Sequence, residues 1–133
     1  MQIMLDTNIL ISIVIFNSEK LKNMILNICD RHTLVLSSYV IQELEEVTNR
    51  KFPNKRKYLD EFLFNLPYKL EYTPSTILDK RALEMRDIKD APVLYSAIIS
   101  DVDILITGDK DFKDVDIEKP EIMTATEFLE KYV

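Results

Sequence analysis

Acidic side chains stand where the sequence pattern indicates the ends of buried strands. Asp6 directly follows the first apolar run of the chain, and Asp109 and Asp111 follow a similar run near the C-terminus. Asp90 opens a helical pattern that leads into that second run. In open parallel sheets, ligands bind beyond the carboxyl ends of the strands. We therefore expect these carboxylates to share one edge of a sheet.

Glu43 is a further candidate acid because of its place on a predicted helix. The apolar residues around Val40 and Leu44 form a stripe, and Glu43 lies about 90° from the centre of that stripe at 100° per residue. Glu45 lies about 110° from the same centre, so the margin between the two acids is small. Glu43 is the acid nearest the buried face.

Each of these acids also has an ordinary structural explanation. Asp6 and Asp90 could cap helices, because an aspartate at such a position accepts hydrogen bonds from the first backbone N–H groups. Glu43 could be a solvated charge at a helix edge. Asp109 and Asp111 could belong to a simple turn.

Converging carboxylates are costly unless a cation joins them, because like charges at contact distance raise one another's pKa or destabilise the fold. Oxygen ligands favour Mg²⁺ or Mn²⁺ over zinc. The single histidine, His32, and the single cysteine, Cys29, exclude a multi-histidine or cysteine-rich zinc site. Such a metal with open positions suits phosphodiester cleavage.

Composition removes other classes of function. The chain has 133 residues, of which 47% are hydrophobic and 30% charged, as expected for one folded domain. Its one glycine, Gly108, excludes the glycine-rich dinucleotide and P-loop motifs. We expect Gly108, at a strand end, to allow a tight turn toward the metal.

Charge is distributed unevenly along the chain. With 23 acids and 17 bases the net charge is −6, which argues against a sequence-independent nucleic-acid binder. A basic segment over residues 50–57 is the exception, and its bases are Arg50, Lys51, Lys55, Arg56 and Lys57. This segment is either a solvated loop between helices or a set of phosphate contacts beside the acidic site.

Strand and helix patterns alternate along the chain. Continuous apolar runs, typical of strands covered on both faces, occupy residues 3–5, 33–38 and 103–108, with weaker runs at 68–72 and 121–123. Helical spacing of apolar residues covers 21–28, 40–47, 58–64, 78–85 and 93–98, and the apolar residues of the third stretch are the aromatic Tyr58, Phe62 and Phe64. Ser75 or Thr76 is expected to cap the 78–85 helix, and a last helix begins near Thr124. These patterns predict an α/β fold of three layers, α/β/α, with a central and mainly parallel sheet, in a single domain over residues 1–133.

Four segments, taken together and in order, resemble the PIN-domain nucleases. They are Leu5–Asn8, Ser38–Leu44, Arg86–Asp90 and Leu105–Phe112. The likeness covers essentially the whole chain and is closest to the VapC-like toxins, the small PIN proteins of bacterial and archaeal toxin–antitoxin systems. It implies a Mg²⁺- or Mn²⁺-dependent endoribonuclease that acts on single-stranded or looped RNA.

The resemblance also implies roles for individual residues. The positions that match the catalytic and metal-binding acidic quartet of the family are Asp6, Glu43, Asp90 and Asp109. Asp111 is an alternative fourth or auxiliary metal ligand, and Asp87 is the alternative to Asp90. Asn8 and Thr107 match positions that orient the carboxylates by hydrogen bonding.

Partners follow from the same resemblance. It implies an RNA substrate, a cognate antitoxin protein and a homodimer. No apolar run approaches the roughly 20 residues that span a bilayer, and the first residues lack a basic stretch ahead of an apolar one. We therefore expect no membrane partner and a cytoplasmic location.

Two rival functions remain open on the sequence. One is a PIN-like module that binds RNA or a partner without cutting it, although the intact acidic set argues against this. The other is a phospho-receiver signalling domain, which needs an aspartate at the end of a central strand. The strand pattern that begins at Thr33 ends in Ser37 and Ser38 instead.

Overall fold

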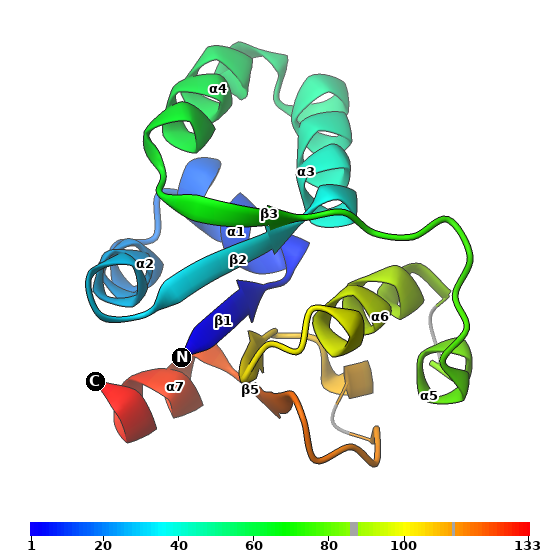
Figure 1. Cartoon of the computed structure of the whole chain (residues 1–133). Coiled ribbons are helices and arrows are strands. Elements are labelled where there is room, and N and C mark those ends of the chain that lie inside the picture. Colours follow the sequence, from blue (N-terminus) through cyan, green and yellow to red (C-terminus); the bar gives the residue numbers. More distant parts are fainter. Residues whose placement is uncertain (86–87, 113) are drawn as a thin grey trace.

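Five parallel strands form the centre of the molecule in the computed structural model, which describes residues 1–85, 88–112 and 114–133. The strands are β1 (Gln2–Leu5), β2 (Thr33–Ser37), β3 (Tyr68–Glu71), β4 (Ile104–Ile106) and β5 (Glu121–Met123). Their order across the sheet is β3-β2-β1-β4-β5, and every neighbouring pair is parallel (Figure 1). The predicted α/β fold with a mainly parallel sheet is confirmed.

The register of the sheet explains why the central strands are continuously apolar. Ile3 of β1 lies beside Leu34 of β2 on one side and Ile104 of β4 on the other. All three side chains are buried, as in a parallel sheet covered on both faces. The edge strand β3 is partly exposed, and this accounts for its weaker pattern.

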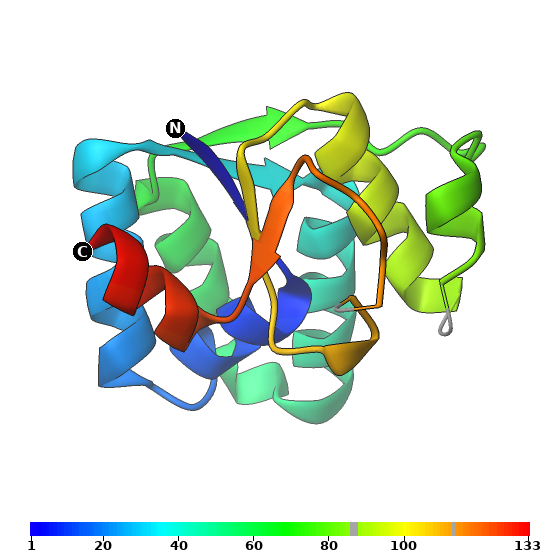
Figure 2. The same cartoon turned by 90° about the horizontal axis from the view of Figure 1, so that it is seen from below.

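Helices cover both faces of the sheet. They are α1 (Thr7–Val14), α2 (Glu19–Arg31), α3 (Ser38–Lys51), α4 (Arg56–Asn65), α5 (Lys80–Leu83), α6 (Ala91–Ile99) and α7 (Ala125–Tyr132). Short 3₁₀ turns occupy η1 (Pro53–Lys55), η2 (Ile88–Asp90) and η3 (Lys110–Phe112). Figure 2 shows α6 on one face of the sheet and α1, α3 and α4 on the other, with α5 beyond α6. The three predicted layers are therefore present.

Side-chain caps define where two of the predicted helices begin. The Ser37 hydroxyl, at the end of β2, accepts a hydrogen bond from the Val40 N–H, so the chain passes from β2 directly into α3. Thr124 and Glu127 form a reciprocal capping box at the start of α7. The predicted start of the last helix near Thr124 is confirmed.

Two details of the helix predictions are wrong. The helix expected over 78–85 is a single turn, α5, and its N-cap is Asp79 rather than Ser75 or Thr76. The Asp79 carboxylate accepts the Arg81 N–H at 2.8 Å, and this local bond starts the turn after Leu78, which is 77% exposed.

The buried face of α4 also differs from the expectation. The apolar pattern over 58–64 correctly predicts a helix, but Leu59 is its buried residue, whereas Phe64 is 89% exposed. An aromatic spacing alone does not show which side of a helix faces the core.

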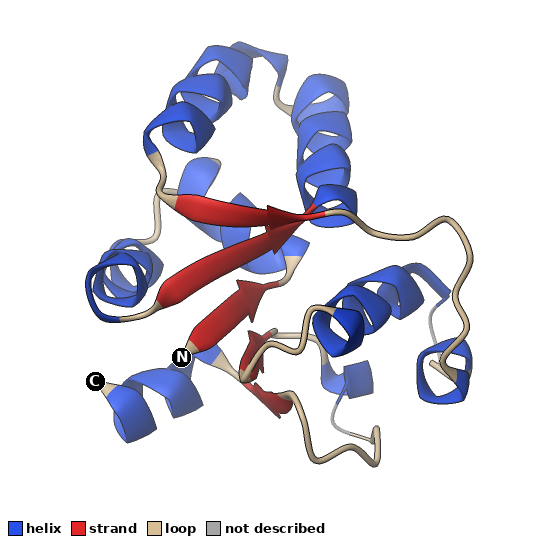
Figure 3. Ribbon diagram, in the orientation of Figure 1, coloured by secondary structure: helices blue, strands red, loops and turns tan. Residues whose placement is uncertain are grey.

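Strands, helices and loops are distinguished in Figure 3, where the arrowheads of β1, β2 and β3 point toward the same edge of the sheet.

Within the described residues, no helix combines the length and the apolar character that crossing a bilayer requires.

Candidate functional site

The order of the strands creates a switch point between β1 and β4. The chain adds β2 and then β3 on one side of β1, and later adds β4 and β5 on the other side. The segments that leave β1 and β4 therefore diverge, which opens a crevice at the carboxyl edge of the sheet. Asp6 follows β1 and Asp109 follows β4 at this crevice.

A cavity of about 200 Å³ lies at this edge, and the whole predicted acidic quartet lines it. The acids are Asp6, Glu43, Asp90 and Asp109, and the other lining residues are Thr7, Asn8, Ile11, Val47 and Lys89. The four carboxylates come from the end of β1, from α3, from η2 and from the segment after β4. Residues far apart in the sequence are thus brought together.

Asp6 is the most deeply placed of the four acids, with 5% of its surface exposed. Its Oδ1 accepts the Thr7 N–H at 2.6 Å, and its Oδ2 accepts the Thr107 hydroxyl at 2.8 Å. Burial raises the pKa of Asp6, the two hydrogen bonds lower it, and the nearby charges of Glu43 and Asp109 raise it further; the net direction is upward. Asp6 therefore caps α1, and it also places at the cavity a carboxylate whose ionised form is destabilised.

Thr107 connects the acids that follow β1 and β4. Its buried hydroxyl donates to Asp6 and accepts the Asp109 N–H at 3.0 Å. The Asp109 carboxylate in turn accepts the Asp111 N–H at 2.9 Å. The orienting bond expected of Thr107 is present.

Asn8 is the other residue expected to orient the carboxylates, and it lines the cavity as an exposed side chain. Among the described residues, no hydrogen bond joins its amide to an acid of the quartet. Its main-chain carbonyl accepts the Ser12 hydroxyl, as part of α1.

Asp90 meets Asp109 and Asp111 closely enough to share a cation. One oxygen from each of the three lies within 4.8 Å of the others. Two ligands of one Mg²⁺ lie at most about 4.2 Å apart, twice the metal–oxygen distance, so small side-chain movements suffice. Asp90 stands at the start of α6 but makes no side-chain capping bond there. Its alternative, Asp87, lies outside the described residues.

Thr7 supplies a second sign that the cavity takes a polar ligand. Its side chain is 3% exposed, and within the described part of the chain its hydroxyl has no hydrogen-bond partner. A buried hydroxyl is normally satisfied by protein, water or a ligand. Thr7 and the four acids line the same cavity, and a lining rich in oxygen atoms fits a hydrated Mg²⁺ or Mn²⁺, which keeps several waters.

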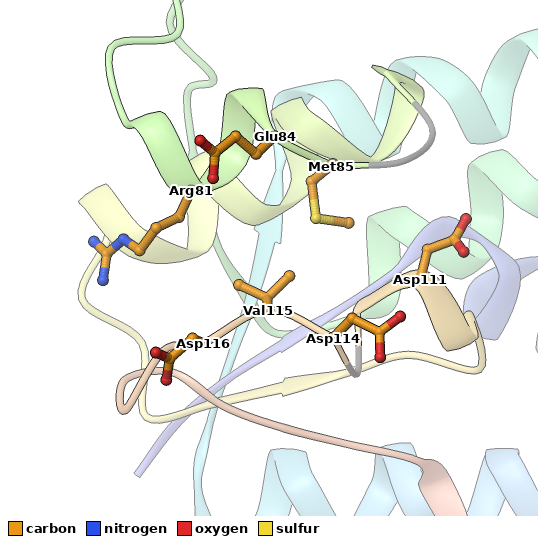
Figure 4. A pocket seen from close by; sticks show the side chains of 7 residues that line it. All are labelled: Arg81, Glu84, Met85, Asp111, Asp114, Val115 and Asp116. Atoms are coloured by element: carbon orange, nitrogen blue, oxygen red, sulfur yellow. The ribbon is translucent and has the colours of Figure 1, made fainter.

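Asp111, one oxygen of which lies near Asp90 and Asp109, lines a larger cavity of about 330 Å³, shown in Figure 4. Figure 4 places Asp111 at one end of the larger cavity and Arg81 with Asp116 at the other. Arg81 is already paired with Asp79 at 2.8 Å. The larger cavity contains none of the quartet, so its size does not make it the reactive site.

The choice of Glu43 over Glu45 agrees with the geometry. Glu43 faces the cavity, whereas Glu45 points to Arg56 with a distance of 3.6 Å between Oε2 and Nη2. Val47 lines the cavity one turn after Glu43.

The basic segment of residues 50–57 is not a loop. Arg50 and Lys51 end α3, and Arg56 and Lys57 begin α4, with η1 between them. Arg56 is engaged by Asp60 at 2.8 Å in addition to Glu45. The Lys55 ammonium lies over the Tyr58 ring, 5.8 Å from its centroid. Within the described part of the chain, Arg50, Lys51 and Lys57 form no ion pair, so they are the bases best placed for an outside anion.

Sequence reasoning missed Lys89, the one basic residue that lines the cavity among the described residues. Its direct proximity to Asp90 in the sequence was the only signal.

Gly108 does not have the expected role: its φ is not positive, and a Cβ atom there would meet nothing within 4 Å. The turn after β4 is therefore open to other residues.

We predict that Asp6→Asn stabilises the metal-free protein at pH 7 by about 1 kcal/mol, a rise of a few degrees in Tm. The amide removes a buried charge that faces Glu43 and Asp109. Because folding raises the pKa of Asp6, the folded protein keeps this proton where the unfolded chain has lost it. The contribution to stability is present at low pH and is lost as the pH rises through the folded-state pKa, so the variant's advantage should shrink on acidification.

Thermal unfolding in a chelating buffer measures this effect, and Asp30→Asn, an exposed aspartate on α2, is the matched control. The control should stay within about 0.5 kcal/mol of wild type. A lower Tm for Asp6→Asn at pH 7 would contradict a cluster of repelling acids.

Comparisons with known proteins agree with this geometry. A family model described as PIN domain matches residues 2–111. A chain in the crystal structure of VapBC2 from Rickettsia felis, bound to a DNA fragment from their promoter, has a TM-score of 0.71 at 21% identity and covers 92% of this chain and 97% of that one. A chain in the DNA-bound VapBC structure from Salmonella typhimurium has a TM-score of 0.67 at 15% identity, covering 92% and 96%.

No curated protein matches the sequence significantly. The two solved structures share the fold, with coverage of nearly the whole chain on both sides. The family model covers most of the sequence, including all four acids of the quartet. The chain therefore belongs to the PIN-domain family, whose members are generally nucleases.

Proposed function

We propose that this protein is a Mg²⁺- or Mn²⁺-dependent endoribonuclease that cleaves single-stranded or looped RNA. The observation that carries the proposal is the convergence of Asp6, Glu43, Asp90 and Asp109 on one cavity at the switch point of the sheet. Membership of a family of nucleases supports the same reaction class.

The residues that would hold the metal are Asp90, Asp109 and Asp111, whose oxygens lie within reach of one ion, together with Asp6 and Glu43 on the same cavity. A bound Mg²⁺ or Mn²⁺ activates water and stabilises the oxygens of an in-line displacement at phosphorus.

Two backbone N–H groups and one side-chain hydroxyl of the protein fix the carboxylates of this site before any substrate arrives. Thr7 and Thr107 hold both oxygens of Asp6, and the Asp111 N–H holds one oxygen of Asp109. Carboxylates fixed in this way need no reorganisation when the reaction begins, which lowers the barrier. Thr107 is the residue through which the positions of Asp6 and Asp109 depend on each other.

Lys89 addresses the repulsion between an acidic cavity and a phosphodiester. Among the described residues it is the one basic side chain on the cavity wall, and we assign it a contact to a phosphate oxygen of the substrate. An ammonium group suits this role because it is a point charge with three donors.

The basic segment extends the same surface. On α3, Glu43, Val47 and Arg50 lie within about 60° of one another at 100° per residue. Arg50 is about 10 Å beyond Glu43 along the helix axis and is exposed. A strand of RNA with a phosphate at the cavity could therefore continue along α3 toward Arg50 and Lys51.

We further propose that the protein is the toxin of a toxin–antitoxin pair in the cytoplasm. The similar solved structures are VapBC complexes, which supports an antitoxin as the protein partner. A homodimer is the assembly that we expect for the chain.

We predict metal-dependent cleavage of single-stranded RNA that requires the quartet. Glu43→Gln should lower the cleavage rate at least about 100-fold, because it removes a cavity carboxylate while keeping its shape. Glu45→Gln, on the same helix but outside the cavity, should stay within about threefold of wild type. Gel-based cleavage assays with Mn²⁺, Mg²⁺ or a chelator measure these rates.

Two results would contradict the proposal. One is the absence of metal-dependent products from the wild-type protein over a broad set of RNAs, which would favour a binding module. The other is product formation that survives in Glu43→Gln at the wild-type rate.

We predict that Arg50 and Lys51 contact RNA phosphates. In an Asp6→Asn background, which blocks cleavage, Arg50→Gln with Lys51→Gln should weaken binding and reduce the salt dependence of the logarithm of affinity by about 1.4, since each contact to a single strand contributes about 0.7. Fluorescence anisotropy over a range of salt concentrations gives the slope.

The charge-matched control is Lys20→Gln with Lys131→Gln, on α2 and α7. This pair should leave the slope near that of the parent. Equal slopes for the two double variants would remove the basic segment from the RNA path.

A further inference from the structure

Another cavity, distinct from the one in Figure 4 and called the second cavity from here on, adjoins the acidic one at the same edge of the sheet. Its volume is about 300 Å³, and it lies among the first turns of α3, the segment after β3 and the start of α6. Tyr39 and Gln42 come from α3, Thr73 and Ser75 from the segment after β3, and Pro92 from α6. None of these residues lines the acidic cavity.

The two cavities share the helix α3. Tyr39 precedes Glu43 by one turn, and residues at that spacing have Cβ atoms roughly 5–6 Å apart. Gln42, Tyr39, Glu43 and Val47 lie in this order within about 140° of the helix circumference, with the first two on one cavity and the last two on the other. Pro92 likewise follows Asp90 by two residues. A ligand in the second cavity is thus next to any phosphate in the first.

Hydrogen bonds hold the walls of the second cavity in place. The Ser38 hydroxyl accepts the Thr73 N–H at 2.9 Å, and the Thr73 hydroxyl accepts the Tyr39 N–H at 3.2 Å. The Thr73 hydroxyl also lies 2.8 Å from that of Ser96 on α6. These bonds tie the segment after β3 to both α3 and α6, so the cavity is formed before a ligand binds.

The lining selects the chemistry of the ligand. Among the described residues, no Asp, Glu, Lys or Arg lines this cavity. Because its lining carries no charge, the cavity is unsuited to a phosphate or to a charged side chain. It offers the Tyr39 ring, the Ser75 hydroxyl and the Gln42 amide, whose Nε2 donates to Glu46 at 3.5 Å and whose Oε1 is an acceptor. Ile77 and Pro92 form the apolar wall. Proteins bind the bases of single-stranded RNA by aromatic stacking and by hydrogen bonds to the base edges.

We propose that this second cavity binds the nucleobase next to the scissile phosphate, with Tyr39 stacking on the base and Gln42 bonding to its edge. The inference rests on the proposed function, because it assigns to that same reaction a subsite for base recognition. Cleavage should therefore depend on the identity of one flanking base.

The test combines a change in the protein with a change in the RNA. A short RNA with a single cleavage site is compared with versions that lack the base on the 5′ or the 3′ side of the cut. We expect loss of one of these bases to lower kcat/KM of the wild-type protein about tenfold or more, given the usual contribution of one stacked base. In Tyr39→Ala the same loss should change kcat/KM by less than about twofold.

Two control variants separate stacking from folding. Tyr39→Phe keeps an aromatic ring and should keep the response to the missing base. Tyr72→Ala removes a neighbouring tyrosine that is 76% exposed and outside the cavity lining, and it should respond as wild type does. The Tm of each variant is measured in parallel, and the affinity of the Asp6→Asn protein for the same RNAs, with and without Tyr39→Ala, provides a second readout that does not need turnover.

The results distinguish failure of the ribonuclease proposal from failure of the base pocket. No metal-dependent cleavage by the wild-type protein would overturn the proposed function, and the binding readout would still decide the base pocket. If the effects of Tyr39→Ala and of the missing base multiply independently in both readouts, the base pocket is overturned while the ribonuclease proposal stands. A change from dimer to monomer in Tyr39→Ala, with independent effects, would assign the cavity to contact between two copies of the chain and would also overturn the inference.

Discussion

Repulsion among carboxylates at the switch point of the sheet is the constraint around which this molecule is organised. Asp6 is buried at the end of β1, and the charges of Glu43 and Asp109 add to the cost of its ionisation. Such an arrangement opposes folding unless a cation or a network of donors compensates it. The donors present are the Thr7 N–H and the Thr107 hydroxyl, and the rest of the compensation is the role that we assign to Mg²⁺ or Mn²⁺.

The fold supplies the rigidity that this site needs. β1 and β4 are paired in register at the centre of the sheet, and their apolar side chains are buried on both faces. The residues directly after them therefore have little freedom, which fixes Asp6 and Thr107 relative to each other. Glu43 depends on a different connection, the Ser37 cap that joins β2 to α3 without a loop. The buried strands of the core thus fix the positions of the side chains at the carboxyl edge of the sheet.

The central strands, with Asp6 and Asp109 after their carboxyl ends, could be predicted because they leave local signals. A continuous apolar run ending in an aspartate describes β1 with Asp6 as well as β4 with the residues after it. What could not be predicted depends on contacts between distant elements. Arg56 is an example, because only the packing of α4 on α3 brings Glu45 within 3.6 Å of it. Its other partner, Asp60, lies four residues further along the same helix and is a local signal.

Other misses have the same origin. Lys89 carries no pattern of its own, and only the tertiary structure puts it on the cavity wall. The buried face of α4 was misjudged because burial at Leu59 follows from packing and not from aromatic spacing. Asp6 shows that a structural and a functional explanation can both hold, since it caps α1 and lines the cavity with the same carboxylate.

The most direct test of the central claim is the change in Tm of the wild-type protein with Mn²⁺ concentration at pH 7. A cation that binds the folded acidic cluster stabilises it by about 2.7 kcal/mol at a concentration of 100 times Kd, so Tm should rise with added Mn²⁺. Asp109→Asn, which alters one of the two acids that belong both to the cavity lining and to the group of close oxygens, the other being Asp90, should lose most of that rise. A Tm that does not change up to millimolar Mn²⁺, or that rises equally in Asp109→Asn, would contradict the account.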